Sequence, residues 1–134
     1  MSEENIEVVR KGIDALNRGD LDGWAACLSP DVVWESRSGV PGLEDVYRGR
    51  GAAREWIEEL NEVVVGLRIE IEQITALSDD RLLVAFVRTG RGRASSIPTQ
   101  HQDWSILRFA EGQITRRQAF WTKDEALEAA GLSG

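Results

Sequence analysis

The chain has 134 residues, which is within the usual range for one domain and short for two. Hydrophobic residues make up 42% and charged residues 29%, which is typical of a soluble globular protein and not of a disordered or membrane protein. The formal charge of −7 at pH 7 argues against nonspecific binding of nucleic acid, because a phosphate backbone attracts clustered Lys and Arg.

The sequence also bears on compartment. No apolar stretch approaches the roughly 20 residues that span a bilayer, and the polar start MSEENIEVVR lacks the core of a signal peptide. The single cysteine, Cys27, can form no internal disulfide, which fits a reducing cytoplasm. We therefore expect one cytoplasmic domain over residues 1–134, without a membrane or nucleic-acid partner.

Apolar residues at spacings of three and four predict three helices in the first half of the chain. A first helix ends near Arg18-Gly19 and buries one stripe: Ile6, Val9, Ile13 and Leu16. Asp20 is expected to cap a second helix that ends before Pro30 and buries Leu21, Trp24 and Leu28, with Cys27 as a core filler on the same helix. A third helix buries Ala53, Trp56, Ile57, Leu60 and Val64.

The second half of the chain reads as strands. Beyond Val65 the apolar period falls to about two, which predicts a strand with one wet face. Residues 81–91 form the next strand, and residues 103–109 and 114–121 form a hairpin around Ala110-Glu111-Gly112. A capping box over residues 122–125 starts a short last helix. Helices followed by strands indicate an α+β domain, in which a bent sheet leaves a pocket where the helices do not fill it.

The basic run RTGRGR, from Arg88 to Arg93, stands out in this acidic chain. One interpretation is that the run holds a phosphate or a carboxylate. The other is that it forms a solvated strand end and turn. Both interpretations stay open.

Four segments carry a resemblance to known proteins. ILRFAEGQI followed by QAFW resembles the last two strands of ketosteroid isomerases and SnoaL-like polyketide cyclases, members of the nuclear transport factor 2-like superfamily. ALNRGDLDGWAACLSPDVVWE resembles the helix, break, helix and first strand of that superfamily, and YRGRGAAREWIEEL its third helix. The tail KDEALEAAGL resembles the SnoaL-like group in particular. The resemblance covers nearly the whole chain and implies a single SnoaL-like domain with a cone-shaped α+β fold, a curved and mainly antiparallel sheet with helices packed in its concavity (cystatin-like roll).

The resemblance also implies which chemistry is missing. Ketosteroid isomerases use a carboxylate base after the first strand, a phenol on the first helix and a protonated acid on the fourth strand. The matching positions here are Ser36, Gly12 and Ser105. We therefore do not expect ketosteroid isomerisation by that route.

The register of the hairpin decides which residues face the pocket. A three-residue turn pairs Ser105 with Arg117, Asp103 with Ala119 and His101 with Trp121. A two-residue turn instead sends the alternate set inward, namely Arg116, Gln118 and Phe120. The resemblance implies that the face carrying Ser105 is the inner one, because the matching position carries a pocket acid in ketosteroid isomerases.

His101 and Asp103 lie two apart on one strand and so share a face. A carboxylate near an imidazole can orient it and raise its pKa, and Arg117 can then hold an oxyanion. Alternatively, Asp103 and Arg117 form a structural ion pair and His101 lies at a solvated strand end. The candidate catalytic residues are His101, Asp103 and Arg117. The candidate substrate-binding residues are Trp24, Trp34, Ser36, Trp56, Leu60, Ser105, Ala119 and Trp121.

Aromatic residues should shape the cavity. Trp34, Trp56 and Trp121 are expected to converge on it and to suit a flat hydrophobic ligand, whereas Trp104 and Ile106 should form an exposed apolar patch on the outer face that mediates a homodimer. The Gly-rich loop from Ser36 to Arg50 should cross the mouth of the cavity. One histidine and no cysteine cluster predict no metal site.

The leading hypothesis is a SnoaL-like enzyme that isomerises, cyclises or hydrates an apolar small molecule by acid/base chemistry, without a cofactor. One alternative is a noncatalytic protein that holds a hydrophobic ligand in the same cone. The other is a dimeric interaction module.

Overall fold

The computed structural model describes residues 2–36 and 46–131. Within these residues, six strands form one open sheet in the order β2-β1-β6-β5-β4-β3. The strands are β1 (Leu28–Glu35), β2 (Val46–Arg48), β3 (Val64–Ser78), β4 (Arg81–Gly92), β5 (Pro98–Ala110) and β6 (Gln113–Phe120). The helices are α1 (Ser2–Asn17), α2 (Leu21–Ala25), α3 (Arg50–Val63) and α4 (Lys123–Ala129). β1 pairs with β6 in parallel, and the other neighbours are antiparallel.

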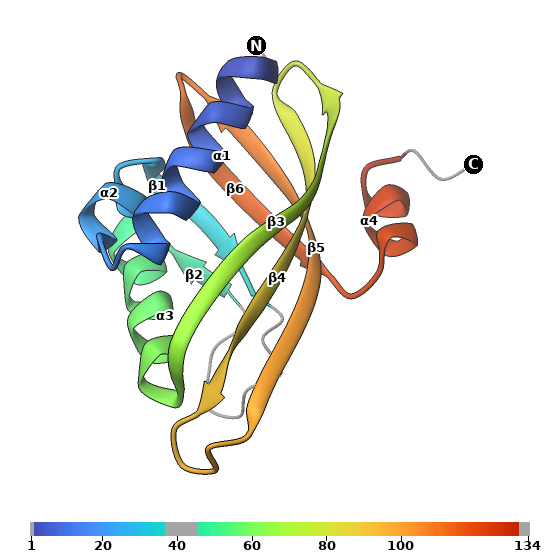
Figure 1. Ribbon diagram of the computed structural model, residues 1–134. Coiled ribbons are helices and arrows are strands. Elements are labelled where there is room, and N and C mark those ends of the chain that lie inside the picture. Colours follow the sequence, from blue (N-terminus) through green and yellow to red (C-terminus); the bar gives the residue numbers. More distant parts are fainter. Residues whose placement is uncertain (1, 37–45, 132–134) are drawn as a thin grey trace.

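The curved sheet has helices on both of its faces (Figure 1). α1, α2 and α3 lie on the inner face, and their apolar stripes form the main core with the inward residues of β1, β4, β5 and β6. α4 lies on the opposite face, against β5 and β6. The expected α+β class with a curved, mainly antiparallel sheet is confirmed. None of the helices in the described part of the chain is long and apolar enough to cross a membrane.

The second helix is shorter than its apolar spacing predicts. Asp20 caps α2 as expected, since its carboxylate accepts the backbone N–H of Gly23 at 2.9 Å. The helix nevertheless ends at Ala25, and Leu28 begins β1 as a fully buried residue. Pro30 lies inside β1, within a register irregularity between β1 and β6 where a missing N–H is tolerated. The expected helix up to Pro30 is therefore wrong, because pairing with β6 outweighs the helical spacing of Leu28.

Cys27 consequently lies between α2 and β1 and not on a helix face. Its side chain is half-buried, and Sγ lies 3.7 Å from the carbonyl oxygen of Gly23. Burial raises the pKa of the Cys27 thiol, which keeps it protonated at neutral pH.

Strand number and strand length also differ from expectation. The short strand β2 has three residues and no alternation to reveal it, so the sequence predicts five strands where the described residues form six. β5 begins at Pro98, five residues before the predicted start, because its polar first half pairs with the end of β4.

The hairpin turn contains two residues, Glu111 and Gly112, with φ angles of 52° and 75°. Ala110 pairs with Gln113, and Thr115 is an extra residue in β6 that shifts the register by one. Ser105 therefore pairs with Ala119 and Leu107 with Arg117, so the pairing expected from a three-residue turn is wrong. The inward set expected from a two-residue turn is also wrong, because the extra residue returns Arg117 and Ala119 to the buried face.

The outer face does not carry the expected exposed patch. Ile106 is 4% exposed because Leu83, Ala126 and other residues of β4 and α4 pack around it, and Trp104 joins the edge of this cluster. The predicted capping box holds α4 in place: the hydroxyl of Thr122 accepts the N–H of Glu125, whose carboxylate accepts the N–H of Thr122.

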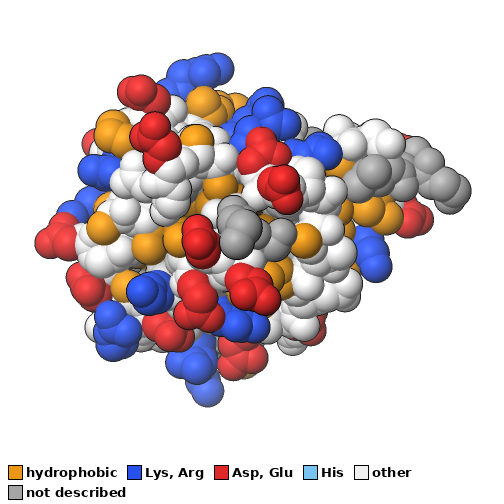
Figure 2. All heavy atoms as spheres, turned by 90° about the horizontal axis from the view of Figure 1, so that it is seen from above, with side chains coloured by type: hydrophobic (Ala, Val, Ile, Leu, Met, Phe, Trp, Pro, Cys, Tyr) orange, Lys and Arg blue, Asp and Glu red, His pale blue; other side chains and the backbone are white. Residues whose placement is uncertain are grey.

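At the end of the molecule that carries the N-terminus of α1, acidic and basic side chains are interspersed (Figure 2).

Candidate functional site

The inner face of the sheet changes from apolar to polar along β4 and β5. Successive inward pairs are Leu82 with Leu107, Val84 with Ser105, Phe86 with Asp103, and Arg88 with His101. Alternation along the strands thus places two charged residues and the single histidine at one end of a hydrophobic surface. The candidate site lies at that end.

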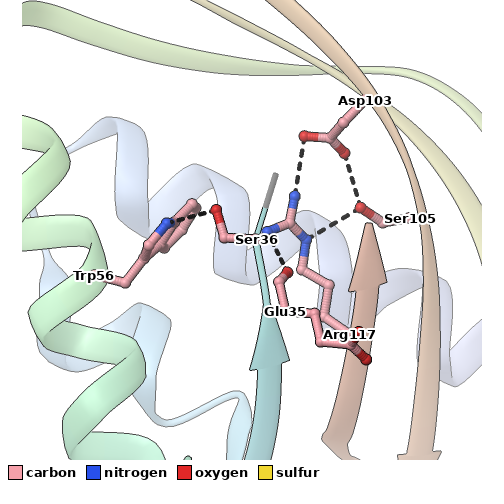
Figure 3. A network of polar contacts seen from close by, with 6 residues as sticks. All are labelled: Glu35, Ser36, Trp56, Asp103, Ser105 and Arg117. Carbon is pink, nitrogen blue, oxygen red and sulfur yellow. Dashed lines mark hydrogen bonds and ion pairs between the residues drawn. The ribbon is translucent and has the colours of Figure 1, made fainter. Parts of the chain in front are cut away.

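Asp103 and Arg117 form a buried ion pair (Figure 3). Nη2 of Arg117 lies 3.0 Å from Oδ2 of Asp103, and the two side chains are 5% and 3% exposed. Ser105 connects them, since its hydroxyl donates to Oδ1 of Asp103 at 2.8 Å and accepts from Nε of Arg117 at 3.1 Å. Arg117 also donates to the carbonyl oxygen of Glu35 at 3.1 Å. Both carboxylate oxygens are therefore engaged in contacts that fix the wall of the site.

Three tryptophans pack beside this pair. The rings of Trp24, Trp34 and Trp56 lie 5.4 to 6.5 Å apart between centroids, and the guanidinium carbon of Arg117 lies 4.9 Å from the Trp34 ring and 5.4 Å from that of Trp56. The space they border, called here the tryptophan cavity, has a volume of about 30 Å³. That volume holds a few waters at most, so this part of the expected ligand space is filled by the side chains themselves.

Trp121 lies apart from this cluster. It is 47% exposed and contacts His101 edge-on, with ring centroids 5.2 Å apart. The expected convergence of Trp34, Trp56 and Trp121 is therefore wrong for Trp121. Trp121 follows the last residue of β6, where strand alternation no longer determines the direction of a side chain.

A larger cavity of about 240 Å³, called here the His101 cavity, opens beside the tryptophan cavity. Its polar lining includes Arg88, Thr99, Gln100 and His101, and its apolar lining is Leu60, Val64 and Leu67. Leu60 and His101 are thus brought together as expected, whereas Asp103, Arg117 and three tryptophans belong to the tryptophan cavity. Arg88 borders both cavities.

The environment of His101 lowers its pKa. Burial is the main cause, the charge of Arg88 adds to it, and Asp103 only partly opposes it. Asp103 does raise the pKa, as expected, but burial and the charge of Arg88 outweigh it, so the expected net increase is wrong. The buried Nε2 atom of His101 has no hydrogen-bond partner in the described part of the chain. His101 is therefore a neutral imidazole at pH 7, with a ring nitrogen left to bind or accept a proton.

The sequence marked Arg88 only as part of the run RTGRGR, as either an anion site or a solvated strand end, and did not place it in the pocket. Arg88 is 8% exposed, and burial lowers its pKa to about 10, with the nearby charge of Arg117 as a second cause. Its Nε atom has no hydrogen-bond partner among the described residues. Arg88 continues the inward alternation of Val84 and Phe86, and that period was the signal that could have separated it from the exposed arginines of RTGRGR.

The positions that match the ketosteroid isomerase residues are occupied by other contacts. Ser36 is buried and accepts a hydrogen bond from Nε1 of Trp56 at 2.9 Å (Figure 3). A Cβ atom added at Gly12 would lie 3.4 Å from Sγ of Cys27 and 3.7 Å from Trp24, so packed side chains fill the space beside it. Ala119 is buried without a polar group. The predicted loop across the mouth, residues 36–50, lies for the most part outside the described residues.

No group of three or more His, Cys, Asp or Glu side chains that could hold a metal ion occurs in residues 2–36 and 46–131. The lining of the His101 cavity offers one imidazole, one guanidinium, neutral polar groups and apolar walls.

Residues 9–117 match the family model of the SnoaL-like domain. Three solved structures are similar in fold. TerC, co-crystallised with polyporic acid, superposes with a TM-score of 0.77 at 20% identity over 93% of this chain and 96% of TerC. An NTF2-like protein of unknown function from Burkholderia pseudomallei gives 0.78 at 22% identity over 93% and 95% of the two chains. A candidate polyketide cyclase from Xanthomonas campestris gives 0.72 at 20% identity over 94% and 96%.

Proposed function

This chain belongs to the SnoaL-like domain family, and on that premise we propose that it is a cytoplasmic enzyme acting on a small molecule in the His101 cavity. The reaction is an isomerisation, an aldol-type cyclisation or a hydration, carried by acid/base chemistry without a cofactor. All three reactions begin with the movement of one proton at or near a carbonyl group or double bond.

The observation that carries the proposal is the position of His101. Its imidazole lies in a cavity large enough for a small organic molecule, and its lowered pKa leaves it unprotonated at neutral pH. A general base must be unprotonated at the working pH and within reach of the proton it removes. Leu60, Val64 and Leu67 supply an apolar wall against which the carbon skeleton can pack.

Asp103 and Arg117 take a different role in this proposal from the one expected for a catalytic pair. Their contacts are with each other, with Ser105 and with the backbone of Glu35. They position the strands that carry His101 and Arg88 and do not meet the substrate. Trp24, Trp34 and Trp56 line the adjoining tryptophan cavity, Ser36 accepts a hydrogen bond from Trp56, and Ala119 pairs with Ser105.

Proton abstraction can be tested without knowing the natural substrate. We expect the protein to catalyse exchange of the acidic C–H protons of aromatic 1,3-dicarbonyl compounds in D2O, followed by NMR. His101→Gln should lower the exchange rate by about 10²-fold or more, because it removes the base while keeping a polar side chain of similar length. Gln102→Ala, at the exposed position of β5 next to His101 and outside the cavity lining, is the matched control and should retain most of the rate.

Equal exchange rates in the wild type and His101→Gln would reject His101 as the base. Saturable binding of these compounds without any exchange would favour the noncatalytic binder instead. The homodimer expected from the sequence is a separate proposal, and its surface is not the patch at Trp104 and Ile106, which α4 covers.

A further inference from the structure

We propose that the His101 cavity binds the carboxylate group of an organic acid, with the guanidinium of Arg88 as its counter-ion. This inference rests on the proposed function, because it names the substrate class of the same cavity. The ligand is a monoanion with an apolar body: the carboxylate meets Arg88, and the hydrocarbon part packs on Leu60, Val64 and Leu67.

The buried charges on the inner face of the sheet do not balance. Arg88, Asp103 and Arg117 are all less than a tenth exposed. Asp103 is committed to Arg117 and Ser105, at 3.0 and 2.8 Å. The three groups therefore leave one buried positive charge without an ionic partner among the described residues.

Folding alone does not account for the unpaired charge of Arg88. A buried cation without a partner destabilises a domain, and an apolar side chain of similar volume would be more favourable at that position. Groups held in such costly environments cluster at functional sites. Nε of Arg88 also lacks a hydrogen-bond partner in the described part of the chain, which leaves a buried donor for a ligand to satisfy.

Arg88 differs in its surroundings from the other arginines of the basic run RTGRGR. Arg93 donates from Nε to the carbonyl oxygen of Glu62 at 2.8 Å and from Nη2 to that of Asn61 at 3.0 Å, so it caps the end of α3. Arg91 is exposed on β4. Of the three arginines in the run, Arg88 alone lines the two cavities, and the run therefore does not form a cluster of cations.

The charge and the size of the His101 cavity favour a carboxylate over other anions. The uncompensated charge is a single one, which matches a carboxylate and not a phosphate dianion. The hydroxyl of Thr99 and the amide of Gln100 add neutral polar groups at the same wall. The cavity volume of about 240 Å³ suits a small acid and excludes a macromolecular polyanion.

His101 is the chain's single histidine, so its imidazole signals in NMR need no assignment among several. The test titrates benzoate, phenylacetate and hexanoate into the protein, with benzamide as the neutral analogue of benzoate. We expect at least one carboxylate to shift the His101 signals saturably and to raise the pKa of His101, because a bound anion favours the imidazolium. Benzamide should bind about tenfold more weakly than benzoate, since it lacks the charge.

Arg88→Met should abolish the preference for benzoate over benzamide, and Arg88→Lys should keep part of it. Arg91→Met removes the same charge from an exposed position of β4 and should leave the preference intact. The melting temperature of Arg88→Met should equal or exceed that of the wild type, which shows that the variant folds. A lower melting temperature with unchanged benzoate binding would make Arg88 a structural residue and overturn the inference.

Equal binding of benzoate and benzamide, or no shift with any of the three carboxylates at millimolar concentration, would also overturn it. These outcomes differ from a failure of the proposed function. Carboxylate binding that depends on Arg88, without proton exchange in any compound, would retain the anion site and remove the enzyme. Exchange that depends on His101, without carboxylate binding, would do the reverse.

Discussion

Arg117 contacts Asp103, Ser105 and the backbone of Glu35. Trp24, Trp34 and Trp56 pack beside these contacts. These contacts favour the structural ion pair over a catalytic role for Asp103. We expect Asp103→Asn and Arg117→Met each to lower the free energy of unfolding by about 3–5 kcal/mol, because each leaves one buried charge without its partner. Urea denaturation measures the change.

Arg116 provides the matched control for that prediction. It pairs with Glu35 at 3.1 Å, but its side chain is 47% exposed and water screens the pair. Arg116→Met should therefore change stability by about 1 kcal/mol or less. Similar losses in Arg116→Met and Arg117→Met would contradict the distinction between the two neighbours.

His101 links stability to pH. Its pKa is lowered in the folded chain, so the unfolded chain takes up this proton first as the pH falls through about 6.5. The stability that the neutral imidazole contributes is present above that pH, declines between the unfolded and the folded pKa, and is constant below both. The difference in unfolding free energy between the wild type and His101→Gln, measured by urea denaturation across this range, should follow that course. A difference independent of pH would show that the pKa of His101 is not lowered.

At the scale of elements, the β5–β6 turn places Glu111 at a φ of 52°, a left-handed conformation that costs a glutamate more than an asparagine. Two-residue turns of this kind favour Asn-Gly, and Gly112 already occupies the second position. Glu111→Asn should therefore raise the free energy of unfolding by about 0.5–1 kcal/mol. Glu111→Ala, which relieves no strain, should not. Equal stabilities of the two variants would show that the turn is not strained.

The sequence predicts elements well where a long period repeats, as in α1, α3, β3 and β4. It fails where a contact between distant segments decides. Leu28 fits a helical stripe until β6 pairs with it, and Thr115 enters β6 as an extra residue that no local pattern marks. The site follows the same division: the sequence places His101 and Asp103 on one face and offers Arg117 as the partner of Asp103, but the separation of His101 from that pair into a second cavity depends on how distant elements pack.

α4 covers apolar residues that would otherwise face water. A chain that ends at Trp121 loses Ala126, Leu127 and Ala130 from the outer cluster and exposes Leu83 and Ile106. We expect this truncated chain to associate, with an apparent mass in light scattering that rises with concentration. Thr122→Ala keeps the helix and should cost only about 1 kcal/mol without association. A truncated chain with the mass of the full-length protein would show that α4 is dispensable as a cover.

For the whole molecule, the outstanding expectation is the homodimer. The exposed large apolar residues of the described chain include Val46, Val63, Val65, Ile97 and Trp121. The three valines lie on β2, α3 and β3, and the other two lie just outside β5 and β6. Light scattering of the full-length chain at micromolar concentration should give the mass of two chains. The mass of one chain would remove the homodimer.

The parallel pairing of β1 with β6 has a consequence for synthesis. Arg116 is made 81 residues after Glu35, so at about 5–20 residues per second the first strand waits roughly 4–16 s on the ribosome before its partner exists. During that interval β1 can pair only with β2, and its other edge stays open to solvent or to a chaperone. Closing this long loop costs chain entropy that the local hairpins do not, whereas the cavity that holds His101 is lined by α3, β3, β4 and β5 and does not need β1 to meet β6.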